Sequence, residues 1–195
     1  MTTPYNKVPA ADNKVYFSYA DVHATITSLH PFLQEFKPDV IVAIGGGGFI
    51  PARILRSVVK KPILAVSLEL YDDSTNTPNM KEGVKILQWF DIQVWPASLV
   101  PGGNVLIVDD VDDTRITLQY CVEQIQKSNP SKIGVAVIHN KRKEKIGTLP
   151  ENVDYFAGMD VLDHWNCYPW DAETYRRDVL EHEKLARSCT REIEE

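Results

Sequence analysis

The sequence predicts a single α/β domain, built on a mainly parallel, twisted sheet with helices on both faces. Two observations support this prediction. Short runs of β-branched and other apolar residues alternate with longer amphipathic segments, which is the pattern of strand, helix, strand units. Two such units follow one another, and the right-handed crossover expected in each makes their strands parallel. The 195 residues contain neither an internal repeat nor a linker, so one domain over residues 1–195 is expected.

The first helix is expected over 18–36. Ser18 is its expected N-cap, because Asp21 stands three residues later and completes a capping box. Pro31 is expected to bend or divide this helix. The first strand, helix, strand unit then follows, with a glycine loop after its first strand: strand 40–44, helix 51–59 and strand 63–68.

The polar segment 71–83 separates the two units and is expected to lack regular structure. Long irregular loops in compact domains are often lids, and we interpret this segment as a lid, with a disordered surface excursion as the alternative. The second unit and the elements after it complete the fold: strand 105–108, helix 114–127, strand 133–138, strand 154–159, an aromatic turn at 165–170 and a charged helix at 173–191.

The composition is that of a soluble globular protein, with 44% hydrophobic and 25% charged residues. The formal net charge of -6 argues against broad contact with nucleic acid or with an anionic membrane surface. Residues 1–14 lack the apolar core of a signal peptide, and the longest apolar stretch, 40–52, is too short to span a bilayer. Three cysteines without C-x-x-C spacing indicate a reducing compartment, so we expect a cytoplasmic protein.

Residues 105–117 read V-L-I-V-D-D-V-D-D-T-R-I-T, so four carboxylates follow directly after a buried strand. Ligands of open α/β sheets bind at the carboxyl ends of the strands, and a turn leading into a helix binds anions. The combination suits a phosphorylated sugar, whose hydroxyls the acids would bind and whose phosphate the turn would bind with Thr114 and Thr117. A metal site of the Walker B type and a coincidental acidic strand end are the alternatives.

Four consecutive glycines, 45–48, lie between a predicted strand and a predicted helix. Such a loop lets backbone N–H groups approach a ligand closely. It lacks the Gly-Lys-Ser/Thr of a P-loop, and Ile50 stands where a dinucleotide fingerprint has its last glycine. We therefore interpret it as a pyrophosphate-binding loop.

The segment 163–171 reads D-H-W-N-C-Y-P-W-D, and its aromatic residues suggest a stacking platform for a flat ring. Lys141 stands just past a predicted strand, at the same edge of the sheet as the acids. Taken alone, a tryptophan is more often part of the core, and a lysine is more often an ordinary surface residue. His139 is expected to have a structural role, and Asp112 is expected to be a solvated loop acid near a helix N-terminus.

The run 105–117 resembles the 5-phosphoribosyl-1-pyrophosphate (PRPP) motif of the type I phosphoribosyltransferases. With the glycine loop, Lys141 and the aromatic segment, the resemblance covers about 38–171 in the family's order. It is closest to purine enzymes of fungal type, the hypoxanthine-guanine and xanthine phosphoribosyltransferases, which share the wording I-G-G-G-G-F-I-P-A-R and V-D-D-T-R. It implies the fold of that family, with a core over about 38–160 and a small hood from the N-terminal and C-terminal segments.

The resemblance also implies a reaction and its components. The 5-phosphoribosyl group of PRPP would pass to N9 of a 6-oxopurine (guanine, hypoxanthine or xanthine) and give the nucleoside monophosphate and pyrophosphate. Mg²⁺ would be required, and the protein would be a homodimer. The alternatives are a regulator that senses PRPP without catalysis and a phosphoribosyltransferase for another base, such as orotate or uracil. Neither an added nucleic-acid-binding domain nor a basic charge balance favours the regulator.

Roles follow from the resemblance residue by residue. Asp113 would be the general base or acid at N7 of the purine, Asp109 and Asp110 would bind the ribose hydroxyls, and Asp171 would bind Mg²⁺. The pyrophosphate loop would comprise Gly45, Gly46 and Gly47, with a cis peptide at Gly45–Gly46. The 5-phosphate loop would comprise Asp113, Thr114, Arg115, Ile116 and Thr117. The purine would contact Lys141 at O6, Trp165 by stacking, and the backbone of Asn166 and Cys167.

Two residues depart from the family's pattern. Many members have Lys or Arg at the position of Gly46, and most have Gly at the position of Arg115. Without a cation at position 46, the pyrophosphate charge would be left to backbone donors, Mg²⁺ and Arg53. At position 115, close approach of the backbone to a phosphate is in question, although an arginine can add positive charge there.

Overall fold

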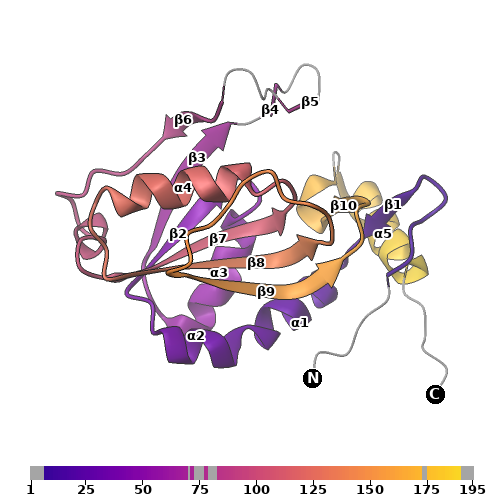
Figure 1. The fold of residues 1–195 in the computed structure, drawn as a ribbon. Coiled ribbons are helices and arrows are strands. Elements are labelled where there is room, and N and C mark those ends of the chain that lie inside the picture. The colour runs from indigo at the N-terminus through magenta and orange to yellow at the C-terminus, as the bar shows by residue number, and fades with distance from the viewer. Residues whose placement is uncertain (1–6, 70, 73–76, 79–82, 173–174, 190–195) are drawn as a thin grey trace.

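The computed structural model of the chain describes residues 7–69, 71–72, 77–78, 83–172 and 175–189 (Figure 1). These residues form a six-stranded sheet in the order β6-β3-β2-β7-β8-β9. The pair β3 and β6 is antiparallel, and every other pair in this sheet is parallel, so the predicted mainly parallel α/β sheet is confirmed. The strand bounds are β2 Val40–Gly45, β3 Ile63–Glu69, β6 Lys85–Gln88, β7 Asn104–Asp112, β8 Lys132–Lys141 and β9 Val153–Val161.

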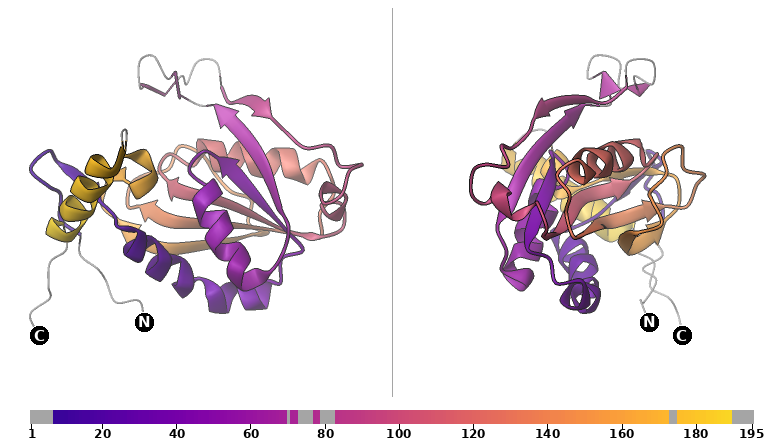
Figure 2. Two further views of the ribbon diagram at one scale, coloured as in Figure 1. Left: turned by 180° about the vertical axis from the view of Figure 1, so that it is seen from behind. Right: turned by 60° about the vertical axis from the view of Figure 1, so that its left-hand side comes forward.

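Helices cover both faces of the sheet (Figure 2). Alternate residues of a strand point to opposite faces, and the two buried clusters follow this rule. Ile41 and Ala43 of β2 belong to the cluster packed by α1, α2 and α3, whereas Val40 and Val42 belong to the cluster packed by α4. The helix bounds are α1 Tyr19–Ser28, α2 His30–Phe36, α3 Phe49–Val59 and α4 Ile116–Gln126.

The predicted first helix is divided into two, as the proline indicated. Ser18 is the N-cap of α1, and its side chain and that of Asp21 form the expected capping box. The helix α1 ends at Ser28, with Leu29 as its C-cap, and Pro31 lies in the first turn of α2, where a missing N–H is tolerated.

A second, smaller unit lies beyond the carboxyl ends of β8 and β9 (Figure 1). The strand β1 (Lys14–Tyr16) pairs in parallel with β10 (Trp165–Cys167), and α5 (Tyr175–Ser188) packs on β1. His182 Nε2 of α5 lies 2.8 Å from the Phe17 carbonyl oxygen, which ties the helix to the segment after β1. Segments from the N-terminal and C-terminal parts of the chain thus build this unit together. Parts of the predicted helix 173–191 lie outside the described residues.

The predicted lid at 71–83 lies largely outside the described residues. Of its described part, β4 (Tyr71–Asp72) and β5 (Thr77–Pro78) form an antiparallel pair, so the expectation of no regular structure was wrong for these four residues. The short edge strand β6 was not predicted. Its sequence, K-I-L-Q, does not alternate apolar and polar residues, because all four residues are exposed and neither face is buried. Two single 3-10 turns complete the described elements: η1 Ala97–Leu99 and η2 Pro169–Asp171.

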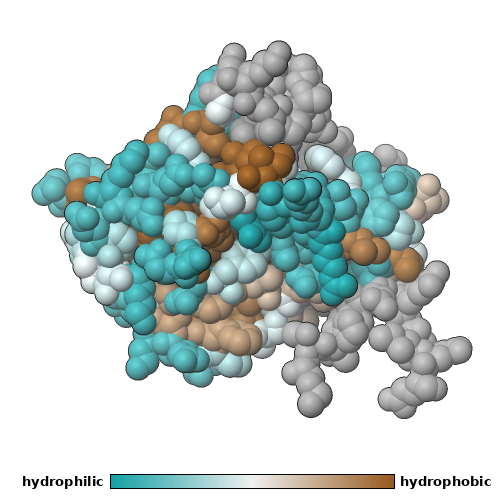
Figure 3. Space-filling model, in the orientation of Figure 1, coloured by the Kyte–Doolittle hydropathy of each residue, from teal (hydrophilic) through white to brown (hydrophobic). Residues whose placement is uncertain are grey.

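The described surface is mixed in character. On the face shown in Figure 3, hydrophilic residues predominate and apolar residues form separate small areas. Among the described residues, no helix is both long and apolar enough to cross a bilayer.

Candidate functional site

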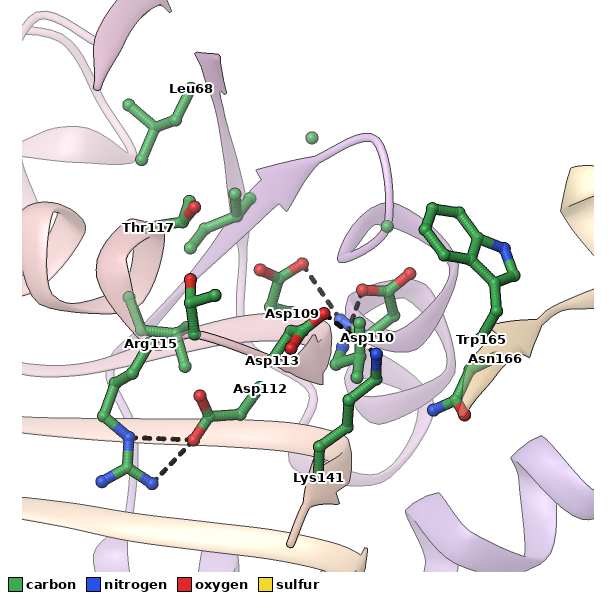
Figure 4. A pocket seen from close by; sticks show the side chains of 16 residues that line it. Leu68, Asp109, Asp110, Asp112, Asp113, Arg115, Thr117, Lys141, Trp165 and Asn166 are labelled. Carbon is green, nitrogen blue, oxygen red and sulfur yellow. Dashed lines mark hydrogen bonds and ion pairs between the residues drawn. The ribbon is translucent and has the colours of Figure 1, made fainter. Parts of the chain in front are cut away.

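A cavity of about 310 Å³ opens at the carboxyl ends of β2 and β7 (Figure 4). It brings together residues from the glycine loop, the acidic strand, the turn into α4, β8 and β10. The predicted site residues in its lining are Gly45, Gly47, Asp109, Asp110, Asp113, Thr114, Arg115, Thr117, Lys141, Trp165 and Asn166. The predicted residues Gly46, Ile116, Cys167 and Asp171 are not part of this lining.

Sequence reasoning missed the apolar part of the wall. Ile44, Leu68, Val111 and Leu118 also line the cavity. Ile44 and Leu68 are the last apolar residues of β2 and β3, and the rule that ligands bind at the carboxyl ends of parallel strands could have found them. Leu118 lies within α4 and carries no comparable signal.

The glycine loop approaches the acids closely. The peptide bond Gly45–Gly46 is cis, as the resemblance implied. A Cβ atom added to Gly47 would overlap the carboxylate of Asp110, so only glycine fits there without moving that side chain. A Cβ on Gly46 would meet nothing within 4 Å, so the structure leaves room for a side chain at this position. Arg53 is exposed on α3 and is not part of the cavity lining.

Asp109 and Asp110 lie near the end of β7, which runs on through Asp112. The Asp109 carboxylate accepts a hydrogen bond from the Asp110 N–H (3.0 Å), and the Asp110 carboxylate accepts one from the Val111 N–H (2.6 Å). Burial, together with the neighbouring Asp110 charge, raises the pKa of Asp109 well above its usual value, and burial raises the pKa of Asp110 to about 7. The pair therefore favours a ligand that brings hydroxyl donors or positive charge.

Asp113 has the opposite electrostatic environment. Lys141 Nζ lies 2.9 Å from its Oδ2, and Lys143 pairs with its Oδ1. Burial alone would raise the pKa of Asp113, but the hydrogen bonds from Lys143 and Lys141 outweigh it and hold the pKa below its usual value. Asp163 completes the cluster, 3.1 Å from Lys143 and 3.4 Å from Lys141. Lys141 is the last residue of β8 and is largely buried, unlike an ordinary surface lysine.

The expectation that Asp112 is a solvated loop acid was wrong. It is fully buried at the end of β7. Arg115 donates two hydrogen bonds to Asp112 Oδ2 (2.9 Å and 2.7 Å), and the Tyr155 hydroxyl donates a third (2.7 Å). A buried carboxylate requires such partners, and Tyr155 lies 43 residues away, where the local sequence gives no sign of it.

The aromatic segment divides between the cavity and the core. Trp165 is 54% exposed and borders the cavity, whereas Tyr168 is buried and Trp170 stacks on it with ring centroids 4.7 Å apart. The expectation of one platform built from all three rings was therefore wrong for Tyr168 and Trp170. His139 Nδ1 lies 2.8 Å from the Tyr168 hydroxyl oxygen, and burial lowers the pKa of His139 to about 3. This neutral, buried histidine agrees with the structural role expected for it.

Asp171 lies in the turn after β10. Its Oδ2 accepts a hydrogen bond from the Tyr168 N–H (3.0 Å), and burial raises the pKa of its carboxyl group. Its charge also contributes to the raised pKa of Asp110. Within the described ranges, no three His, Cys, Asp or Glu side chains are grouped as a metal site.

Comparison with known proteins gives a consistent result. The model of the phosphoribosyl transferase domain matches residues 21–170. Hypoxanthine-guanine phosphoribosyltransferase of Saccharomyces cerevisiae is 38% identical, over 91% of this chain and 92% of that protein. Xanthine phosphoribosyltransferase 1 of the same yeast is 37% identical, over 92% of this chain and 98% of that protein.

A solved structure is similar over nearly the whole chain. It is that of a hypothetical protein from Neisseria gonorrhoeae with bound ppGpp, which is 40% identical to this chain. The TM-score is 0.77, and the match covers 90% of this chain and 97% of the other.

Proposed function

Because this chain belongs to the phosphoribosyltransferase family, we propose that it transfers the 5-phosphoribosyl group of PRPP to N9 of a 6-oxopurine and serves purine salvage. The products would be GMP, IMP or XMP and pyrophosphate. One observation carries the proposal: a single cavity is lined by the glycine loop, the acids of β7, the turn into α4, Lys141 and Trp165. The similarity to hypoxanthine-guanine and xanthine phosphoribosyltransferases over most of the chain supports the 6-oxopurine as acceptor.

Each part of PRPP has a suitable partner in the cavity. The carboxylates of Asp109 and Asp110 would accept hydrogen bonds from the ribose hydroxyls, which would favour their ionised forms. The amides of the glycine loop would bind the pyrophosphate, and the amides at the start of α4, with Thr114 and Thr117, would bind the 5-phosphate. These contacts would hold C1 of the ribose near the base.

The base would lie between Trp165 and Lys141. N9 attacks C1 while the bond from C1 to the pyrophosphate oxygen breaks, and the purine loses a proton from N7. Asp113 would accept that proton, because the two lysines keep its carboxylate ionised in the free protein. Lys141 has three donors, so it can hold Asp113 and O6 of the purine together.

Mg²⁺ would be held by Asp171 and by oxygens of PRPP. When bound, it would neutralise charge on the departing pyrophosphate. A cation there would also favour the ionised forms of Asp171 and Asp110, whose pKa values are raised in the protein alone.

We further propose a cytoplasmic homodimer of single-domain subunits, each with a hood formed by its terminal segments. Its partners would be small molecules, without nucleic acid or membrane. Light scattering coupled to size exclusion would give the mass of the assembly, to be compared with 22.1 kDa for one chain.

The proposed activity is tested by pyrophosphate release from PRPP and Mg²⁺ with guanine, hypoxanthine, xanthine, adenine or orotate. Turnover is expected with one or more of the three 6-oxopurines, and only when Mg²⁺ is present. Turnover with orotate or adenine alone would assign another base. Measurable PRPP binding with no turnover on any base would favour the PRPP sensor.

A second ligand is favoured by one specific observation, the bound ppGpp in the related Neisseria protein. This nucleotide contains a guanine, a ribose and pyrophosphate groups, which are the groups that the cavity is proposed to bind. We therefore propose that ppGpp occupies the same cavity and inhibits by competition with PRPP. Inhibition that high PRPP concentrations do not relieve would contradict a shared cavity.

The glycine loop gives a prediction about affinity. Gly47→Ala is expected to weaken PRPP binding about tenfold, because the new methyl group displaces the Asp110 carboxylate, which is proposed to bind the ribose hydroxyls. Gly46→Ala adds the same methyl group where it meets nothing within 4 Å and should cost less. Titration calorimetry of both variants with PRPP and Mg²⁺ checks the order. Equal losses would mean that the overlap with Asp110 is unimportant.

The charge cluster gives a prediction about pH. Lys143→Met removes one of the two cations that lower the pKa of Asp113, while burial still raises it, so this pKa must rise. The acid limb of the kcat/KM profile for the purine is expected to move to higher pH, with lower activity on that limb. Arg142→Met is the matched control, since Arg142 is exposed and pairs with Asp160 instead of Asp113. An unmoved acid limb in Lys143→Met would contradict this assignment of the titrating group.

A further inference from the structure

We propose that Asp112, Arg115, Tyr155 and Lys145 form a clamp that holds the turn before α4 in its phosphate-binding conformation. In this clamp, Arg115 acts as a positioning residue and not as a phosphate ligand. The inference rests on the proposed function of that turn, residues 113–117, as the 5-phosphate loop. It concerns residues to which the proposed reaction gives no role of their own, apart from the backbone of Arg115.

The buried carboxylate of Asp112 is the centre of the clamp. It is fully buried, yet three hydrogen bonds reach its Oδ2, two from Arg115 and one from Tyr155. The Arg115 guanidinium also lies over the Tyr155 ring, 4.9 Å from its centroid. Because an unpaired carboxylate is disfavoured at a buried site, these contacts fix Arg115 against β7 and β9.

The side chain of Arg115 points away from the side of the 5-phosphate loop on which the phosphate is proposed to bind. In Figure 4 its guanidinium points toward Asp112, and Thr117 lies on the opposite side of the Arg115 backbone. If the guanidinium swung toward a phosphate, it would leave Asp112 buried with two of its three hydrogen bonds lost. From the sequence, this arginine could add positive charge at the phosphate site. In the structure its guanidinium binds Asp112 instead, so it supports the loop without facing the proposed phosphate position.

The second half of the clamp binds the carbonyl groups of the loop. Lys145 Nζ donates to the carbonyl oxygens of Asp112 (2.6 Å) and Asp113 (3.0 Å). The N–H groups of Ile146 and Gly147 both donate to the Thr114 carbonyl oxygen, at 3.1 Å and 2.9 Å. Three successive carbonyl groups are thus turned toward residues 145–147.

Turning the carbonyl groups outward leaves the amides for a ligand. The first amides of an α-helix have no acceptor within the helix, and α4 has no side-chain cap at its N-terminus. The residues just before and within its first turn line the cavity. A phosphate that enters the cavity therefore meets N–H groups, because the clamp has already bound the oxygens.

The clamp also explains how an arginine occupies a position where most family members have glycine. Arg115 has φ 70°, a left-handed conformation that glycine adopts readily and other residues rarely do. Its two bonds to Asp112 hold it there. On the other side of the loop, a Cβ added to Gly147 would overlap the Arg115 carbonyl group, so glycine at 147 permits the close packing.

Tyr155→Phe is the first test, because it removes one hydroxyl and keeps the ring under the guanidinium. Calorimetry is expected to show GMP bound about tenfold more weakly than by the wild type, with guanosine binding and kcat changed by less than about twofold. Guanosine lacks the 5-phosphate, so it reports the base and ribose sites alone. Tyr120→Phe on α4 is the matched control, since Tyr120 is partly buried and has no hydrogen bond described in the structure. Equal loss of GMP and guanosine, or no loss of either, would overturn the clamp.

A second pair of variants separates positioning from direct phosphate binding. Arg115→Gly is expected to weaken GMP binding and lower the unfolding temperature, because the buried Asp112 carboxylate loses two hydrogen bonds and keeps only Lys145, 3.6 Å from its Oδ1, as a cationic partner. Adding Asp112→Val removes the stranded charge, glycine accepts the left-handed backbone, and Lys145, Ile146 and Gly147 still bind the carbonyl groups of the loop. GMP affinity is therefore expected to recover to within about threefold of the wild type. If the double variant bound GMP as weakly as Arg115→Gly, the stranded charge of Asp112 would not explain the loss and the proposal would fail. Wild-type protein that bound neither GMP nor PRPP would refute the proposed function instead.

Discussion

Asp113→Asn is expected to lower kcat by about 10²- to 10⁴-fold while the Kd for PRPP changes by less than about threefold. The substitution keeps the size of the side chain and removes its ability to accept the N7 proton. Proton transfer occurs in the transition state, so its loss appears in turnover and not in the binding of a substrate that lacks the base. Steady-state kinetics with saturating purine, together with PRPP calorimetry, separate the two quantities.

Asp163→Asn is the control for this experiment. Asp163 contacts the same two lysines, at 3.4 Å from Lys141 and 3.1 Å from Lys143, but it does not line the cavity. It tests whether disturbing the lysines alone is enough to slow the reaction, and its effect on kcat should be below about tenfold. Equal loss of turnover and PRPP affinity in Asp113→Asn would remove the assignment of Asp113 as general base.

Trp165→Ala is expected to weaken purine binding by about 1 to 3 kcal/mol, the range found when aromatic residues that stack on bases are replaced. This corresponds to about a 5- to 150-fold rise in the KM for the purine. Trp165 borders the cavity and is 54% exposed, so it has a free face, and its removal should affect the core little. PRPP binding should change much less, because the stacking surface contacts only the base.

Trp95→Ala serves as the matched control, since Trp95 is 70% exposed and does not line the cavity. The KM for each of the three 6-oxopurines and the Kd for GMP are measured for both variants. An unchanged KM for the purine in Trp165→Ala would show that this ring does not stack on the base.

Acids that lie within five residues of one another have contrasting pKa shifts. Burial raises the pKa of Asp110 to about 7 and the pKa of Asp109 also rises, while the hydrogen bonds from Lys143 and Lys141 lower the pKa of Asp113. The first two acids gain from a ligand that donates hydrogen bonds. Asp113 is already ionised and can accept a proton once the purine is bound.

Local sequence patterns predicted most of the fold and much of the candidate site. β-Branched runs and amphipathic periods give the order of strands and helices, and Ser18 with Asp21 marks the start of α1. Once the strands are parallel, their carboxyl ends lie on the same side of the sheet, so the glycine loop and the acids of β7 are expected there, and the pairing of β2 with β7 brings them together. Most of the motif residues accordingly line the cavity, because covalent order and strand direction largely decide where they lie.

Only the tertiary structure decided which side chains face the ligand and which support it. The sequence could not show that Asp112 is buried, because Tyr155 and Lys145, which bind it and its carbonyl group, come from a distant strand and loop. Nor could it show that Tyr168 is buried in the core with Trp170 stacked on it, while Trp165 borders the cavity. Burial and hydrogen bonding depend on neighbours from every part of the chain, and the free energy of burying a charge is set by those neighbours, not by the residue itself.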